Sequence, residues 1–325
     1  MLKDRVLYHL EKGRGSIVTG GSLARELGVS RTAIWKAINA LKEEGKVIES
    51  RPNSGYILLD RGDSLIKHAI EEGLTGDFMG RNLVILRSTQ STNQYIKGLD
   101  IGSIKEGMTV IADQQTSGRG RMGRPFISPA GEGIYMSILL KPKLLLQETQ
   151  FLTICAAVAV SRAIEALCKV KMDIKWVNDI YYEGKKLCGI LTEAFVSAEM
   201  QTVEYAVLGI GLNTGKVAPD IRSIATSLKE IGCNKGNRNP LIAEILNRFE
   251  EVYRDYSVKG SKKEIIQAYE DRLFIKGKSV LISGLGEDYQ ATVIGIDEKG
   301  GLIIRDDAGL IRHIVSGEIK RIKEQ

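Results

Sequence analysis

Residues 118–124, which read GRGRMGR, are the part of this sequence best suited to act on a charged ligand. The glycines let backbone N–H groups approach a ligand closely, and the arginines grip oxyanions with forked hydrogen bonds. We expect such a loop to be mobile when empty and ordered around a polyanion. A solvated basic loop and an Arg-Gly tract for RNA are the alternatives, but a single short copy directly after the strand-like run MTVIADQQ argues against the tract.

The same stretch formally matches the G-x-G-x-x-G fingerprint of dinucleotide-binding folds. That fingerprint requires a helix that starts inside it and an acidic residue about 20 positions later. Here Pro125 and Pro129 follow, and the region near Lys143 is not acidic. The chain also contains no G-x-x-x-x-G-K-[ST] phosphate loop, so neither of these nucleotide-binding folds is predicted.

Three further groups of polar residues stand out: Ser91-Thr92-Asn93, the run KWVND at 175–179, and the run KKLCGI at 185–190. Each has an ordinary structural explanation when taken alone. Ser91 suits a helix N-cap, Asn178-Asp179 suits a turn, and Lys186 suits an exposed surface. Their meaning depends on whether they occur together.

The cysteines and histidines indicate neither a metal site nor a disulfide framework. The four cysteines (155, 168, 188 and 233) show no C-x-x-C spacing and have no histidine close by in sequence, so we expect buried thiols. The three histidines (9, 68 and 313) all lie away from the polar groups described above.

The N-terminal segment, residues 1–62, has the pattern of a winged helix-turn-helix. Helices are expected over 2–12, Ser22–Leu27 and Arg31–Glu44, followed by the strand-like runs KVIES and GYILL. Ser22 and Ser30 are the expected N-caps, and Gly28 suits the left-handed end of the second helix.

The third helix has one apolar and one polar face. Ile34, Ala37, Ile38 and Leu41 recur at helical spacing and should face the core. The outer face then carries Arg31, Thr32, Trp35, Lys36 and Asn39. In such a motif the second helix of the pair fits the DNA major groove. We therefore expect Arg31, Thr32, Lys36 and Asn39 to bind DNA, although a helical protein-interaction module is the alternative.

The central segment, residues 63–272, mixes strands and helices without regular alternation, which favours a largely antiparallel α+β domain. The last segment, 273–325, contains short strands separated by Gly, Asp and Glu turns, which suggests a small barrel. Strands are expected at 83–86, 108–112, 133–140, 173–176, 187–195 and 203–210, and helices at 92–97, 148–167, 240–258 and 262–272.

Composition indicates a soluble globular chain, since 43% of its residues are hydrophobic and 26% are charged. Its most apolar helix is interrupted by Arg162 and Glu165, and the N-terminus lacks a signal-peptide core, so we expect a cytoplasmic protein without membrane contact. Residues 1–62 hold 11 Lys or Arg against 7 Asp or Glu, a difference of +4 out of a net +6. The excess supports a nucleic-acid partner at this end.

Five motifs now occur in a fixed order: STN, Q-x-x-GRGR-x-GR, KW-x-ND, KK-L-x-GI and GIGLN. In this order they resemble the bifunctional biotin protein ligases, in which a winged helix precedes the ligase domain. The resemblance covers essentially the whole chain. It implies an α+β multidomain protein with a winged helix-turn-helix, a mixed α+β ligase domain and a small SH3-like β-barrel.

The resemblance also implies site residues. Biotin and its adenylate would contact Ser91, Thr92, Asn93, Gln115, Arg119, Gly120, Arg121 and Lys186. Lys186 would reach the activated carboxyl and the α-phosphate. Asn178, Asp179 and Asn213 would lie near the nucleotide, with Asp179 as the ligand of Mg²⁺, and Arg121, Lys186 and Asp179 would be catalytic.

The resemblance further implies that ATP with Mg²⁺ and biotin are consumed to make biotinyl-5'-AMP, which also serves as corepressor. The expected partners are a biotin carboxyl carrier protein or a pyruvate carboxylase acceptor domain, operator DNA, and a second copy of the chain in a homodimer. The expected genes under repression serve biotin synthesis and transport.

Three departures and two alternatives remain. Val177 replaces a proline usual in the KW-x-ND motif, Phe126 replaces a common tryptophan, and the only tryptophans are Trp35 and Trp176, which leaves the packing of adenine open. A biotin-sensing transcription factor that no longer catalyses would have lost Lys186 or a loop arginine. A lipoate ligase would share the general fold but not the arginine run or the winged helix.

Overall fold

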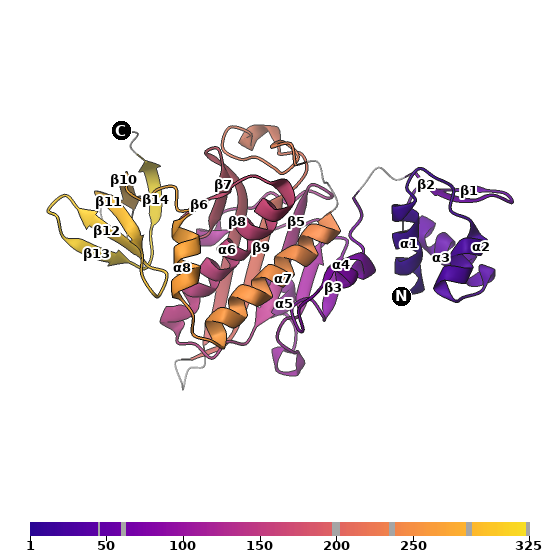
Figure 1. Cartoon of the computed structure of the whole chain (residues 1–325), viewed down its shortest axis with the longest axis horizontal. Helices are drawn as coiled ribbons and strands as arrows, with labels where there is room; N and C mark the ends of the chain where they lie inside the picture. Colours follow the sequence, from indigo (N-terminus) through magenta and orange to yellow (C-terminus); the bar gives the residue numbers. More distant parts are fainter. Residues whose placement is uncertain (45, 60–62, 197–201, 234–237, 284–287, 323–325) are drawn as a thin grey trace. The chain divides into compact units, whose positions relative to one another are not determined.

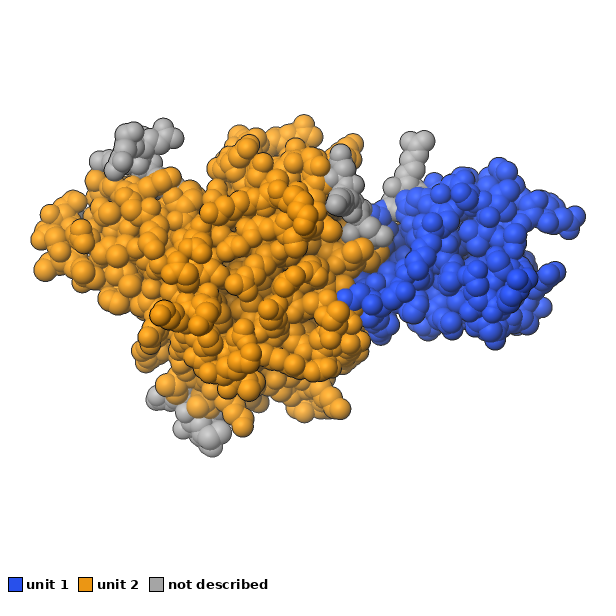
Figure 2. All heavy atoms as spheres, in the orientation of Figure 1, with its two compact units in different colours: residues 1–73 blue, residues 74–325 orange. Residues whose placement is uncertain are grey.

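The computed structural model describes all residues except 45, 60–62, 197–201, 234–237, 284–287 and 323–325. The chain forms two compact units, residues 1–73 and residues 74–325, which Figure 2 colours separately. Each unit is described by itself below.

The first unit is a helix-turn-helix with a β-hairpin wing. Ser30 caps α3 by accepting the N–H of Ala33, and Gly28 ends α2 with φ 66°, both as predicted. The hairpin strands pair in antiparallel register from Ile48–Leu58 to Arg51–Gly55. The elements are α1 (Leu2–Lys12), α2 (Gly20–Leu27), α3 (Arg31–Glu43), β1 (Ile48–Arg51), β2 (Gly55–Leu58) and α4 (Lys67–Gly73).

Two details differ from the prediction. Helix α2 begins at Gly20 and not Ser22, because Thr19 is its N-cap and accepts the N–H of Ser22 through its hydroxyl. Helix α4 was not predicted. It belongs to the first compact unit, where Glu72 accepts a hydrogen bond from Tyr8 of α1. The boundaries at 62 and 272 proposed from sequence remain predictions.

The core of this unit is built from the predicted face of α3. Ile34, Ile38 and Leu41 are almost completely buried, and Ala37 is nearly so. They pack with apolar residues of α1, α2 and the wing into one cluster. Because one face of α3 packs into the core, the opposite face of the helix points to the surface of the unit.

The second unit is organised by a seven-stranded sheet in the order β3-β4-β5-β9-β8-β7-β6. Only β3 and β4 pair in parallel, so the predicted antiparallel α+β character is confirmed. The strands are β3 (Leu83–Leu86), β4 (Thr109–Ala112), β5 (Gly133–Leu140), β6 (Asp173–Lys175), β7 (Asp179–Tyr182), β8 (Lys185–Val196) and β9 (Val203–Asn213).

Helices α6 (Thr149–Cys168), α7 (Arg238–Ser257) and α8 (Lys263–Glu270) cover one face of this sheet in Figure 1. Helix α6 is long and apolar enough to cross a membrane by composition alone, but 72% of its most apolar window is buried inside the unit. It packs against α7 and β8, so its apolar surface forms protein core. A fourth helix, α5 (Thr92–Lys97), packs on β5 and β9.

A small antiparallel sheet ends the unit, in the order β13-β12-β11-β10-β14. It confirms the predicted small C-terminal β-domain. Trp176 connects it to the larger sheet, because its indole N–H donates to the carbonyl of Gly300 at 3.0 Å. The strands are β10 (Ser279–Ser283), β11 (Tyr289–Ile296), β12 (Leu302–Asp306), β13 (Ile311–Ile314) and β14 (Glu318–Ile322).

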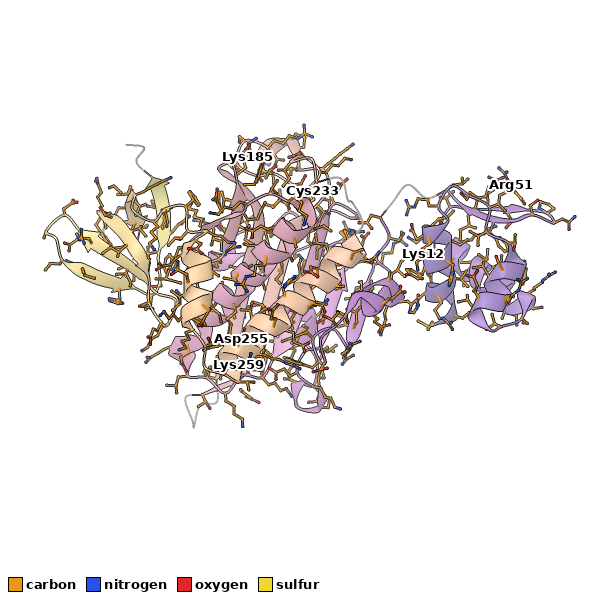
Figure 3. All side chains as sticks on the ribbon, in the orientation of Figure 1. Lys12, Arg51, Lys185, Cys233, Asp255 and Lys259 are labelled. Carbon is orange, nitrogen blue, oxygen red and sulfur yellow. A yellow bond between two sulfur atoms is a disulfide. The ribbon has the colours of Figure 1, made fainter. Side chains whose placement is uncertain are left out.

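The prediction that all four cysteines are free thiols is wrong for two of them. Cys168, at the end of α6, and Cys233, which Figure 3 labels, form a disulfide with a Cα–Cα distance of 5.2 Å. Folding brings together two residues that are 65 positions apart, which their spacing in the sequence does not reveal. Cys155 and Cys188 are buried thiols as expected, and burial raises the pKa of both.

Candidate active site and DNA-binding face

The second unit contains a cavity of about 330 Å³ at the centre of the large sheet. Its volume is in the range of small-molecule sites. All five motifs contribute residues to its lining, and the second motif contributes the arginine loop, defined here as residues 118–124. The polar lining is Ser91, Thr92, Asn93, Gln115, Arg119, Arg121, Arg124, Lys175, Asn178, Asp179, Lys186 and Glu318.

Two glycines of the fifth motif, GIGLN, make room at the base of the cavity. A Cβ at Gly211 would lie 2.6 Å from the ring of Phe126, and a Cβ at Gly209 would collide with the amide oxygen of Asn93. Both glycines are on β9, where they pair with Gly189 and Leu191 of β8. The alternation of glycines along β9 therefore permits side chains from distant segments to pack on the strand.

A network of side-chain hydrogen bonds fixes one end of the cavity, and its member Asn93 also donates to the Glu193 carboxylate at 2.7 Å. The side-chain oxygen of Gln115 accepts the backbone N–H of Thr92 at 2.9 Å, and its amide nitrogen donates to Ser128 at 3.0 Å. The hydroxyl of Ser137 lies 2.6 Å from both Thr92 Oγ1 and Asn93 Oδ1. Buried polar groups held this way are preorganised to recognise an uncharged polar ligand group.

The arginine loop adds cations to the lining of the cavity. It contains a short 3₁₀ turn over Arg121–Gly123, in which Met122 has φ 55° and is 80% exposed. The guanidinium of Arg121 donates to the side-chain oxygen of Asn178 at 3.2 Å. The loop thus reaches the KWVND segment without being packed into the core.

A second cation comes from β8. Lys186 Nζ lies 2.7 Å from Asp179 Oδ1, and both side chains are only partly exposed. The backbone of Lys186 also pairs with the segment that follows β9, donating its N–H to Ile224 O and accepting the N–H of Thr226, both at 2.9 Å. Adjacent residues, Asn178 and Asp179, therefore hold the two cations Arg121 and Lys186.

Lys175 is a third cation of the cavity. Burial lowers the pKa of its ammonium group, while the nearby Asp179 and Glu318 carboxylates oppose that change. Lys175 is the last residue of β6 and directly precedes Trp176. A partly desolvated ammonium group interacts strongly with an anionic ligand, because little water screens it.

The C-terminal sheet also contributes to the cavity through Gly317, Glu318 and Ile319. Glu318 of β14 accepts two hydrogen bonds from Arg124, at 2.6 and 2.5 Å. These bonds hold the pKa of Glu318 below its usual value. The small β-domain is therefore joined to the arginine loop by a bidentate ion pair.

The structure brings nearly all the predicted ligase residues to one cavity. Asn213 is the exception, because its amide donates to Thr226 O at 3.0 Å and the residue does not line the cavity. Sequence analysis assigned no role to Lys175, Trp176, Ile224 or the 317–319 segment. The KWVND motif itself was a signal for the first two, whereas nothing in the sequence marked the C-terminal residues.

The described residues contain no group of three or more His, Cys, Asp or Glu side chains that could hold a metal ion. Magnesium ordinarily keeps several waters and uses one or two carboxylates together with substrate phosphates. Asp179 in the cavity is a donor of this kind, so the site fits an ion that arrives with a nucleotide.

The first unit presents the predicted DNA-binding face. Arg31, Thr32 and Lys36 on α3 are exposed, and Asn39 is half-buried. Arg51, labelled in Figure 3, extends from the wing.

Comparison with known proteins identifies the family. The chain is 38% identical over 322 residues to the bifunctional ligase/repressor BirA of Bacillus spizizenii, an alignment that covers 98% of each chain. This chain belongs to the bifunctional biotin ligase and repressor family. It is therefore a biotin–protein ligase that carries a helix-turn-helix domain.

Further matches support each part of the biotin ligase and repressor assignment. Residues 3–57 match a helix-turn-helix domain, 85–213 the biotin/lipoate A/B protein ligase family, and 276–320 the biotin protein ligase C-terminal domain. The BirA of Escherichia coli is 29% identical over 309 residues and covers 94% of this chain. A biotin protein ligase from Aquifex aeolicus, solved with biotin and ATP, superposes with a TM-score of 0.65 at 31% identity, covering 74% of this chain and 99% of its own.

Proposed function

We propose that the cavity joins the carboxylate of biotin to the α-phosphate of ATP, and that the activated biotin then passes to one lysine of a carboxyl carrier domain. The observation that carries this proposal is the placement of two cations beside neighbouring residues. Arg121 donates to Asn178, and Lys186 forms an ion pair with Asp179. The amide and hydroxyl groups of Gln115, Asn93 and Ser137 are suited to hydrogen-bond the uncharged polar ring of biotin.

The first half-reaction requires no general base. A free carboxylate has a pKa of about 4.3 and is already an anionic nucleophile at neutral pH. The obstacle is its repulsion from the polyphosphate, which Arg121, Lys186 and Lys175 offset while they stabilise the charge that builds on the phosphorus. Asp179 would be the protein ligand of a magnesium ion that arrives with the nucleotide, and that ion would supply further positive charge.

The second half-reaction does require loss of a proton. The acceptor lysine has an ordinary pKa of about 10.4, so its ammonium group must lose a proton before it attacks the mixed anhydride. Asp179 is the carboxylate nearest to Lys186 in the cavity. We propose that Asp179, which lies 2.7 Å from Lys186 Nζ, receives that proton while AMP leaves from the mixed anhydride.

The repressor activity follows from coupling between the two units. We propose that biotinyl-5'-AMP orders the arginine loop, that the ordered loop favours a homodimer, and that the dimer presents two α3 helices to a two-part operator. Arg31 and Thr32 would reach bases, and Lys36 and Asn39 phosphates. ATP, carrier protein and DNA occur together in the cytoplasm, where we place the protein.

The decisive experiment incubates the full-length chain with biotin, MgATP and a biotin carboxyl carrier domain, and measures the mass of the acceptor. A biotin-sized gain on one lysine is expected, and an acceptor whose target lysine is replaced by arginine is the control. Binding of biotin without transfer would instead indicate a sensor, and preference for lipoate would indicate a lipoate ligase.

The DNA-binding half is tested by deleting residues 1–73, which form their own compact unit. The remaining chain is expected to transfer biotin but not to bind operator DNA. If DNA affinity ignores both this deletion and the addition of biotin with MgATP, the repressor half of the proposal is wrong.

A further inference from the structure

Helix α3 carries a large apolar side chain on its polar face. The Trp35 side chain is 55% exposed, whereas the preceding residue, Ile34, is completely buried. Trp35 does not belong to the apolar cluster formed by the described residues of the first unit. The chain's other tryptophan, Trp176, is 4% exposed and hydrogen-bonded to Gly300. The core of the first unit therefore does not explain Trp35.

The neighbours of Trp35 on the helix surface are polar or positively charged. Arg31 lies one turn before it and Asn39 one turn after it, and Lys36 is adjacent. Single exposed apolar residues are common on protein surfaces. A tryptophan is different, because its side chain can bury roughly 150–250 Å² against a partner and is favoured where one edge is apolar and another is polar.

Arg31 does not cover the indole. Its guanidinium folds back over the first turn of α2, where a Cβ at Gly21 would lie 3.2 Å from Arg31 Nη2. Gly21 has no side chain, so the guanidinium occupies that space. The cation therefore lies beside the start of α2, and Trp35 is the large apolar side chain exposed on the first two turns of α3.

We propose that Trp35 contacts the 5-methyl group of a thymine in the major groove, so that α3 reads an A·T pair through an apolar contact. The positive charge of Arg31 and Lys36 selects duplex DNA as the occupant of this face. The thymine methyl is the apolar group that the major groove presents to a recognition helix. This inference rests on the proposed DNA-binding role of α3.

The test uses full-length protein, biotin, MgATP and a duplex selected by the wild-type chain from a random pool. Each thymine is replaced in turn by deoxyuridine, which removes only the methyl group. One replacement should weaken wild-type binding about fourfold, as expected for burial of one methyl group. Trp35→Ala should weaken binding to the thymine duplex by about tenfold and should lose the response to that replacement.

Val47→Ala is the matched control, since Val47 is also 55% exposed in the same unit. It should leave DNA affinity unchanged. Trp35→Phe keeps an apolar ring and should retain a reduced methyl response. All three variants should transfer biotin at the wild-type rate, because none of them lies in the ligase unit.

Fluorescence supplies a readout that does not depend on affinity. Trp35 and Trp176 are the only tryptophans, so the emission change on DNA binding should disappear in Trp35→Phe. Wild-type affinity in Trp35→Ala, or a methyl response that persists in it, would overturn the thymine contact while leaving the DNA-binding role of α3 intact. A wild-type chain that selects no duplex would overturn both.

Discussion

The molecule carries two cationic surfaces that are built in opposite ways. On α3 the cations project from a helix whose other face is held by Ile34, Ile38 and Leu41 in a closed core. In the arginine loop the backbone has few internal hydrogen bonds, among them Gly120 N–H to Arg124 O at 2.8 Å and Arg124 N–H to Arg121 O at 3.2 Å. The helix surface is fixed by a packed core, whereas the loop is held by a few backbone hydrogen bonds and by its contacts to Asn178 and Glu318.

The difference corresponds to the anions that each surface is proposed to bind. A DNA duplex has a fixed groove, so a preformed helix face fits it with little loss of conformational entropy. An adenylate is small and must be surrounded, which requires a chain that can close around it. Exposed contacts to many phosphates are strongly screened by salt, whereas partly buried pairs such as Lys186–Asp179 are screened less.

Replacing the cation fixed on β8 should have the largest effect. Lys186→Gln is expected to lower the rate of adenylate formation by about 10²–10³-fold, the cost of losing one group that stabilises charge in the transition state. Adenylation should suffer more than ATP binding. Lys185→Gln, at the exposed neighbour labelled in Figure 3, is the control. Unchanged pyrophosphate release at saturating substrates would remove Lys186 from the catalytic residues.

Replacing the loop cation should act on retention of the intermediate. Arg121→Ala removes a charge-assisted contact and should weaken adenylate binding by about 1.5–3 kcal/mol. A rapid-quench and filter assay measures how long the enzyme keeps biotinyl-5'-AMP. Met122→Ala, at an 80% exposed position in the same loop, is the control. Equal retention in Arg121→Ala and wild type would show that the loop does not grip the adenylate.

The α3 surface should respond through salt. Lys36→Ala is expected to weaken binding to all DNA sequences and to reduce the slope of log affinity against log salt by about 1, since one phosphate contact is lost. Arg31→Ala should instead relax base preference. Gel shifts at several salt concentrations separate the two outcomes, and a Lys36→Ala slope equal to wild type would place Lys36 away from phosphate.

The smallest effect is expected at the ion pair that joins the loop to the C-terminal sheet. Arg124 is 62% exposed, so Glu318→Gln should cost no more than about 0.2–1 kcal/mol. Because the folded-state pKa of Glu318 is lowered from 4.5, the pair contributes above that value and is lost as the pH falls through the lower folded pKa. Comparing Glu318→Gln, Arg124→Gln and the double variant isolates the pair, and additive effects would show that it contributes nothing.

Sequence reasoning recovered the elements that carry strong local signals. Ser30 and Gly28 mark both sides of the turn before α3, and the period of Ile34, Ala37, Ile38 and Leu41 fixes its buried face. The sequence predicts the start of α2 after Gly20 and Gly21, because glycine is a poor helix former. Thr19 nevertheless caps the helix through its hydroxyl.

Long-range contacts set the limit for the site. The ordered motifs predicted that Ser91, Gln115, Arg121 and Lys186 share one ligand, and the fold places them around one cavity. The spacing of residues could not show that Glu318, which is almost 200 positions from Arg124, also lines the cavity. It also could not show that Asn213 supports the following segment through Thr226 and lies outside the cavity.

The Cys168–Cys233 bond closes a covalent ring that contains β6, β7, β8 and β9, the strands that carry Lys175, Asp179 and Lys186. Such a ring acts mainly on the unfolded chain, because it removes extended conformations that the open chain would sample. Reduction of the disulfide therefore raises the conformational entropy of the unfolded chain. It leaves the contacts around the cavity in place. In a reducing cell these four strands would keep their geometry but lose part of their resistance to unfolding.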